Sequence, residues 1–89
     1  MDLVFEWDPR KVKANLEKHR IAFAEATSVF GDPMAWIFPD AAHSTAEERE
    51  IIVGHSQPKR LLLVCFAEPG DGRVRIINAR RDQEGAARL

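Results

Sequence analysis

The apolar positions of the 89-residue chain change their spacing after residue 30. Before that point they recur every three or four residues over two segments, 9–19 and 23–30, which is the period of amphipathic helices. Afterwards they form short apolar or alternating runs that are typical of strands, at 35–38, 47–55, 60–66 and 73–80. Another such run, 3–7, precedes the first helix. The pattern therefore predicts the order strand, helix, helix, strand, strand, strand, strand.

The boundaries of these segments have the chemistry of helix caps and turns. Asp8 fits an N-cap and Pro9 the first helical position. The segment 31–33, glycine first and proline last, is typical of a helix end. Turn signals at 56–59 and 69–72 separate the last three strands, which predicts an antiparallel meander. We expect an α+β fold in which the N-terminal strand and both helices pack on one face of this meander and leave the other face open.

Length and composition indicate one small cytoplasmic domain over residues 1–89. A chain that is 45% hydrophobic and 30% charged builds a modest core at this length, so we expect a surface groove as the site. No apolar run reaches the about 20 residues that cross a bilayer, and no export signal begins the chain. Cys65 lies in an apolar run and is predicted to be a buried hydrophobe. Residues 82–89 are predicted to form a short or frayed tail.

Charge is distributed unevenly, although the chain has a net charge of only −1. Residues 1–48 contain five Lys or Arg against nine Asp or Glu, and residues 49–89 contain eight against five. Such asymmetry indicates contact with a polyanion, and arginine matches phosphate geometry especially well. The alternative is a sheet edge protected by charge. Trp7 and Trp36 are predicted to pack in the core, with base stacking as the alternative.

The candidate chemistry does not involve a cofactor or a metal. The three histidines, at 19, 43 and 55, fall on separate predicted elements, so we expect no metal site. Charged residues concentrate at 47–50, where a strand begins. Attack by the 2′-hydroxyl of RNA needs a base, an acid and cations around the phosphorane, and these residue types supply such groups. The alternative is a set of cross-strand ion pairs.

A longer set of residues runs in order through positions 5–81. Its first half is Phe5, Trp7, Asp8, Pro9, Lys11, Asn15, Lys18, His19, Phe23, Glu25, Ala26, Val29, Phe30, Asp32 and Pro33. Its second half is Asp40, His43, Ser44, Glu47, Glu48, Arg49, Gly54, Ser56, Arg60, Leu62, Val64, Arg75, Ile76, Ile77, Ala79 and Arg80. In this order and spacing the chain resembles the BrnT family of toxins.

The resemblance implies a fold, an activity and partners. The fold is RelE-like, and the activity is that of a metal-independent ribonuclease that inhibits translation. The implied protein partner is a BrnA-type antitoxin, which neutralises the toxin and takes the complex to promoter DNA. The chain itself would contact RNA but no membrane. A homodimer, or a heterotetramer with the antitoxin, is the expected assembly.

The resemblance also assigns roles to residues of this sequence. Glu48 is expected to act as the catalytic base or to position one. Arg49, Arg60 and Arg80 are expected to bind the scissile phosphate and to stabilise its charge in the transition state. We therefore predict that the three guanidinium groups converge on one cluster, with Glu48 at its rim.

Four further residues are expected to contact RNA: Lys18, His19, His43 and Arg75. For three of them a structural role is an alternative. Lys18 suits the end of a helix dipole, His19 suits a helix cap or the core, and His43 suits a loop contact with Ser44.

The chain departs from the family's pattern in two places. Arg20 stands where the family usually has the glycine of a left-handed helix end, a conformation that costs a non-glycine residue about 1 kcal/mol. The family usually continues into a longer charged helix that ends near a Tyr-Glu pair, whereas this sequence has no tyrosine. The second departure favours an alternative function, a catalytically inactive homologue that binds an antitoxin as a co-repressor.

Overall fold

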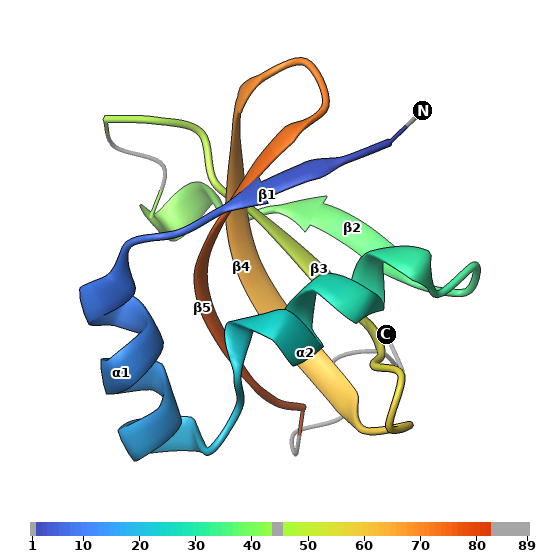
Figure 1. The fold of residues 1–89 in the computed structure, drawn as a ribbon. Helices are drawn as coiled ribbons and strands as arrows, with labels where there is room; N and C mark the ends of the chain where they lie inside the picture. Colours follow the sequence, from blue (N-terminus) through green and yellow to red (C-terminus); the bar gives the residue numbers. More distant parts are fainter. Residues whose placement is uncertain (1, 44–45, 83–89) are drawn as a thin grey trace.

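The computed structural model describes residues 2–43 and 46–82 (Figure 1). Its elements are β1 (Val4–Glu6), α1 (Pro9–His19), α2 (Phe23–Ser28), a 3-10 turn (Val29–Gly31), β2 (Trp36–Pro39), a second 3-10 turn (Ala41–His43), β3 (Glu50–His55), β4 (Leu61–Gly70) and β5 (Arg73–Arg81). The predicted order of helices and strands is confirmed. The predicted tail, apart from Asp82, lies outside the described residues.

One sheet contains all these strands, in the order β1-β5-β4-β3-β2. Strands β2 to β5 form the predicted antiparallel meander. The predicted place of β1 was wrong, because this strand joins the sheet and lies parallel to β5. The backbone N–H of Val4 donates to the carbonyl of Gly72 at 2.8 Å. A short strand packed among helices would leave its backbone groups without partners, and the outer edge of β5 supplies them.

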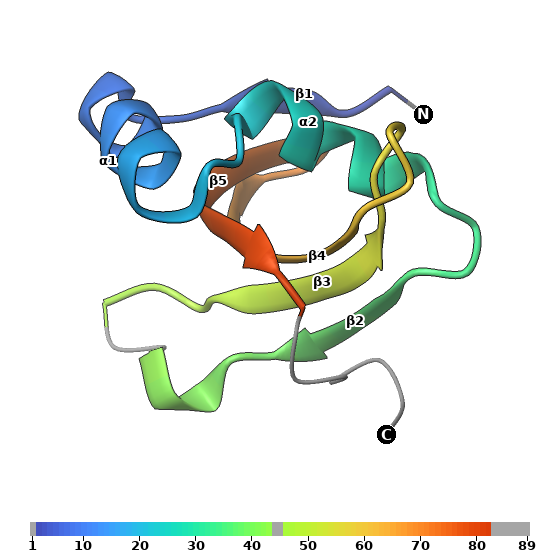
Figure 2. The same cartoon turned by 90° about the horizontal axis from the view of Figure 1, so that it is seen from below.

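The two faces of the sheet differ. Helix α2 lies across one face, and α1 lies beside β5 (Figure 2). The main core fills the face under α2 and consists of Ile21, Phe23, Ala26, Val29, Ile52, Leu62, Val64, Phe66, Val74, Ile76 and Ala79. A smaller cluster of Cys65, Ala67 and Ile77, with Ile51 against it, occupies the opposite face. β4 is therefore buried on both faces over much of its length.

Helix α1 has the predicted ends. The Asp8 side chain accepts a hydrogen bond from the backbone N–H of Arg10 at 2.9 Å, and Pro9 follows it. Arg20 ends the helix with φ 61° and ψ 30°, in the left-handed region that favours glycine. Among the described residues, no helix is long and apolar enough to span a bilayer.

Candidate functional site

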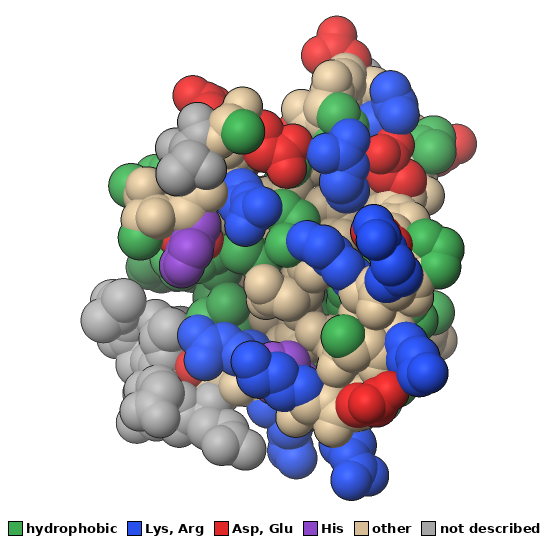
Figure 3. Space-filling view, turned by 90° about the vertical axis from the view of Figure 1, so that its left-hand side faces the viewer, with side chains coloured by type: hydrophobic (Ala, Val, Ile, Leu, Met, Phe, Trp, Pro, Cys, Tyr) green, Lys and Arg blue, Asp and Glu red, His purple; other side chains and the backbone are tan. Residues whose placement is uncertain are grey.

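A groove of about 570 Å³ lies on the open face of the sheet, bordered by α1 and by the 3-10 turn Ala41–His43. Figure 3 shows this side of the molecule, where Lys and Arg side chains surround a recess with hydrophobic residues at its floor. The residues that line it are Lys11, Ala14, Asn15, Lys18, His19, Asp40, His43, Arg49, Ile51, Leu63, Cys65, Ile77, Asn78 and Arg80.

The groove is positively charged, although the whole chain is nearly neutral. Among the described residues that line it, four are Lys or Arg and one is a carboxylate. Two further lining residues, His19 and His43, add imidazoles. A concave surface with an excess of cations raises the local concentration of anions. The groove therefore has the electrostatics of a site for phosphate groups.

A β-bulge in β5 directs Arg80 into this groove. Cys65 pairs with Asn78 and Phe66 pairs with Ile76, so Ile77 is the extra residue. Side chains alternate between the faces of a regular strand, and the bulge shifts this alternation by one position. Ile76 therefore faces α2, whereas Arg80 faces the groove; without the bulge both would share one face.

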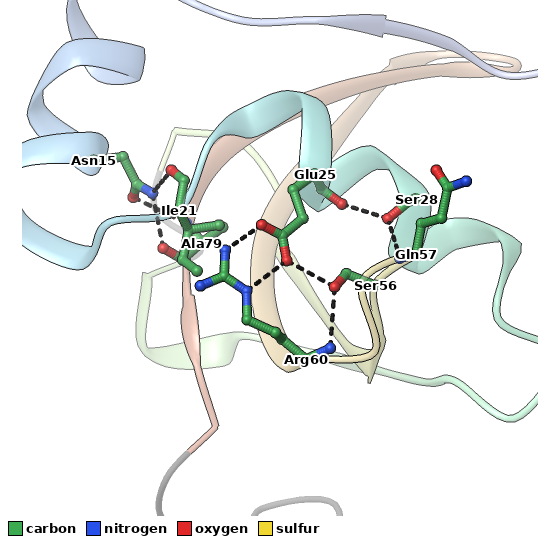
Figure 4. Close-up of polar contacts among 8 residues, drawn as sticks. All are labelled: Asn15, Ile21, Glu25, Ser28, Ser56, Gln57, Arg60 and Ala79. Carbon is green, nitrogen blue, oxygen red and sulfur yellow. Dashed lines mark hydrogen bonds and ion pairs between the residues drawn. The ribbon is translucent and has the colours of Figure 1, made fainter.

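The buried side chain of Asn15 fixes the same part of β5 (Figure 4). Its amide nitrogen donates to the carbonyls of Ile21 and Ala79 at 2.9 and 2.8 Å, and its oxygen accepts from the N–H of Ala79 at 3.0 Å. These bonds join the middle of α1, and the segment that follows the helix, to Ala79, the residue that precedes Arg80. Asn15 thus fixes the position of His19 relative to Arg80.

His19, the last residue of α1, is partly buried at the groove. Its burial lowers the pKa of the imidazole, and the positive charges of Lys18 and Arg80 lower it further. Because the usual pKa of histidine is about 6.5, this ring is neutral at pH 7 and able to accept a proton.

On the other border of the groove, Asp40 holds His43. Nδ1 of His43 lies 3.0 Å from each carboxylate oxygen of Asp40, which leaves Nε2 for a substrate. The hydrogen bond with His43 lowers the pKa of Asp40, against the effect of burial. The N–H of Asp40 donates to the carbonyl of Arg49 at 2.8 Å, so the two residues face each other beyond the paired ends of β2 and β3.

Cys65 lies next to Asp40. Its thiol donates to Oδ2 of Asp40 at 3.4 Å, and burial, followed by this contact, raises its pKa to about 11. The thiol is therefore protonated at pH 7 and is unsuited to act as a nucleophile. The prediction of a buried Cys65 is confirmed.

Most of the residues predicted for the site are brought together here. Arg49 and Arg80 line the groove with Lys18, His19 and His43. Glu48 does not line it; this exposed residue borders a neighbouring recess, which shares Arg49 with the groove. The predicted contact of His43 with Ser44 falls on a position outside the described residues.

Two predicted arginines do not line the groove. One of them, Arg60, belongs to the three guanidinium groups that were expected to converge, so that prediction was wrong. Arg60 precedes β4 and forms an ion pair with Glu25 of α2, where Nε donates to Oε2 at 2.9 Å (Figure 4). Arg75 forms ion pairs with Glu6 and Glu47, at 3.1 and 3.0 Å. Each of these arginines is held by a carboxylate from another part of the chain. The spacing of residues along a strand does not predict such distant partners.

Three residues of the site had no predicted role: Lys11, Asn15 and Asp40. All three matched the family's pattern. For Asp40 a local signal existed, because an Asp three residues before a His, in a polar segment after a strand, suits a 3-10 turn that joins the two side chains. For Asn15 the signal was a polar residue beside the apolar stripe of α1. Among residues 2–43 and 46–82, no three His, Cys, Asp or Glu side chains lie close enough to hold a metal ion.

The chain is similar to a known protein family and to a solved structure. Residues 7–84 match the model of a family described as the ribonuclease toxin BrnT of type II toxin–antitoxin systems. The fold is similar to the crystal structure of the Brucella abortus ribonuclease toxin BrnT, with a TM-score of 0.69 and 24% sequence identity, over 93% of this chain and 97% of that one. No match is found among the curated proteins.

Proposed function

Because the chain belongs to the BrnT family of ribonuclease toxins of type II toxin–antitoxin systems, we propose that it is a metal-independent endoribonuclease that inhibits translation by cleaving RNA in the basic groove. A toxin of this class has an antitoxin as its partner. We propose a BrnA-type antitoxin, through which promoter DNA is contacted indirectly, and a cytoplasmic site of action. The RelE-like superfamily and the assembly, homodimer or heterotetramer, stay predictions.

One observation supports this proposal most strongly: two imidazoles from different elements border a groove that also contains Arg49 and Arg80. Cleavage by the 2′-hydroxyl needs this set of groups. Neutral His19 takes the proton of the 2′-hydroxyl, and the 2′-oxygen then bonds to phosphorus. The bond from phosphorus to the 5′-oxygen breaks, and His43 gives a proton to that oxygen. The products are a 2′,3′-cyclic phosphate and a free 5′-hydroxyl.

The cations of the groove serve the phosphate groups. Arg49 and Arg80 stabilise the charge of the phosphorane, an effect that depends on donors held in place before the reaction. Lys11 and Lys18, both exposed on α1, contact the neighbouring phosphates. We assign the base to His19 rather than to Glu48, because Glu48 does not line the groove.

The test is cleavage of a short RNA by the purified chain in the presence of EDTA. We expect ends with 2′,3′-cyclic phosphate, and no cleavage where the 2′-hydroxyl is replaced by hydrogen. His43→Ala should lower the rate about 100-fold or more. The matched control is His55→Ala, because His55 lies 3.6 Å from Asp32 as part of a second Asp–His pair outside the groove.

Expression in a bacterial cell extends this test. The unaltered chain should arrest growth, and His43→Ala should relieve the arrest. If the folded chain binds an antitoxin but cleaves no RNA, the proposal is wrong and the inactive, antitoxin-binding homologue is the better description.

A further inference from the structure

The two tryptophans have different surroundings. Trp7 packs against Phe23, with ring centroids 5.9 Å apart, although 39% of its surface is exposed and neither core cluster of the described residues includes it. Trp36, in β2, has 56% of its surface exposed and belongs to neither core cluster of the described residues. The prediction that Trp7 and Trp36 pack in the core was therefore wrong. A large, exposed aromatic ring on a sheet offers a flat apolar surface on which a nucleobase can stack.

The register of the strands places Trp36 on the same face as the groove. Trp36 pairs with Val53, Val53 pairs with Leu63, and Leu63 pairs with Arg80. Directly paired residues of antiparallel strands point to the same face. Leu63 and Arg80 both line the groove, so this cross-strand row begins at the basic groove and ends at Trp36.

The length of the row suits an extended nucleic acid. Neighbouring strands lie about 4.8 Å apart, so β5 and β2, three steps apart in the sheet, are separated by roughly 14 Å. Arg80 binds phosphate at one end of the row. The other end offers an aromatic ring, on which any nucleobase can stack. Partly exposed Leu63 provides an apolar floor between them.

We propose that Trp36 is a nucleobase-binding platform, on which a base close to the scissile phosphate stacks while that phosphate lies at Arg80. This inference rests on the proposed function, since it names a subsite for the same RNA. The charge of the adjoining groove favours RNA over a protein as the ligand. The neighbouring exposed residue Ile37 alternates with Trp36 along β2 and lies on the other face, so the apolar surface of β2 is divided between two faces.

Trp36 fluorescence gives a direct test. In Trp7→Phe, Trp36 is the remaining tryptophan, and its emission is titrated with an oligoribonucleotide that carries 2′-O-methyl groups and therefore cannot be cleaved. Stacking should quench the emission. Inorganic polyphosphate, which has the charge but no bases, should bind without quenching.

Affinity for the same oligonucleotide gives the second test. Trp36→Ala should raise the dissociation constant roughly 5- to 100-fold, the range expected for the loss of one stacked base. Trp36→Phe, which keeps a ring, should lie between this variant and the unaltered chain. The matched control is Ile37→Ala, because Ile37 is also 56% exposed in β2, and its affinity should equal that of the unaltered chain. Thermal unfolding shows that each variant is folded.

Three results would overturn the inference. Trp36→Ala with the affinity of Ile37→Ala would exclude a contact with RNA, and unquenched emission with bound RNA would exclude stacking. Loss of antitoxin binding with RNA affinity intact would assign Trp36 to a protein interface. In each of these cases the unaltered chain still cleaves RNA, so the proposed function stands. A chain that neither binds nor cleaves RNA would contradict both.

Discussion

Arg60 and Arg80 lie at the same sheet and have opposite electrostatic surroundings. Arg60 donates two hydrogen bonds to Glu25, whose side chain is only 13% exposed, and Ser56 donates a third to that carboxylate at 2.7 Å. Arg80 lines a groove in which Lys and Arg outnumber carboxylates among the described residues. Arg80 is thus available for a substrate because the fold surrounds it with an excess of positive charge, whereas a nearly buried acid occupies Arg60.

The largest expected effect comes from removing the arginine on the groove side. Arg80→Ala should lower kcat/KM for RNA cleavage about 100- to 1000-fold, because a preorganised donor to the transition state is lost. Its melting temperature should change little, since the side chain is exposed. Cleavage assays and thermal unfolding measure both quantities. Full activity in Arg80→Ala would contradict a role of Arg80 in binding the substrate.

The second variant removes Arg60 and so breaks its ion pair with Glu25. Arg60→Ala leaves a nearly buried carboxylate without its cation, and we expect the melting temperature to fall by roughly 5–15 °C. The folded molecules should still cleave RNA.

Arg73→Ala is the matched control for this variant. Arg73 pairs with Glu6 at 2.6 Å on a more exposed surface, so its loss should have a much smaller effect on the melting temperature. Equal melting temperatures of the Arg60 and Arg73 variants would contradict the structural role of Arg60.

The pH dependence of stability isolates Glu25. The hydrogen bond from Arg60 lowers the pKa of Glu25 below the value of about 4.3 that it has in the unfolded chain. Its stabilisation is therefore complete above that pH and is lost as the pH falls through the lower folded value. Glu25→Gln should be less stable near neutral pH and should lose less stability below about pH 4.3. Urea unfolding at several pH values measures this, and parallel curves would refute it.

The smallest effect is expected on the pH dependence of cleavage, which tests the role of His19 in the groove. Since Lys18 contributes to the lowered pKa of His19, Lys18→Gln should move the acid limb of kcat/KM to higher pH. Protonated His19 cannot act as the base, so in the unaltered chain activity should fall only below about pH 6.5. Rate measurements between pH 5 and 8 show the shift. An acid limb that stays in place would argue against His19 as the base.

The sequence was sufficient for features that depend on neighbours along the chain. The period of apolar residues predicted both helices and four strands of the meander, and Asp8, Pro9 and Arg20 predicted the ends of α1. Features that depend on distant partners were not predictable in this way. The parallel pairing of β1, the Glu25–Arg60 ion pair and the bulge at Ile77 each depend on which edge or charge another element presents.

The resemblance to a family predicted only part of the site. It identified Arg49, Arg80, Lys18, His19 and His43, which the structure places at one groove. It could not distinguish a residue that is kept for the fold, such as Arg60, from one that faces the groove. That distinction needs the three-dimensional position of Glu25.

The pairing of β1 with β5 has a consequence for synthesis on the ribosome. Among the strands of residues 2–43 and 46–82, the first one made pairs with the last one, β5, which also contains Arg80. Pairing between strands so distant in sequence is slow, because the chain between them has to be ordered as well. We expect the nascent chain to lack a complete groove until β5 has been translated, which would delay toxicity and leave time for an antitoxin to bind. Cleavage of RNA by stalled chains that end before residue 73 would contradict this expectation.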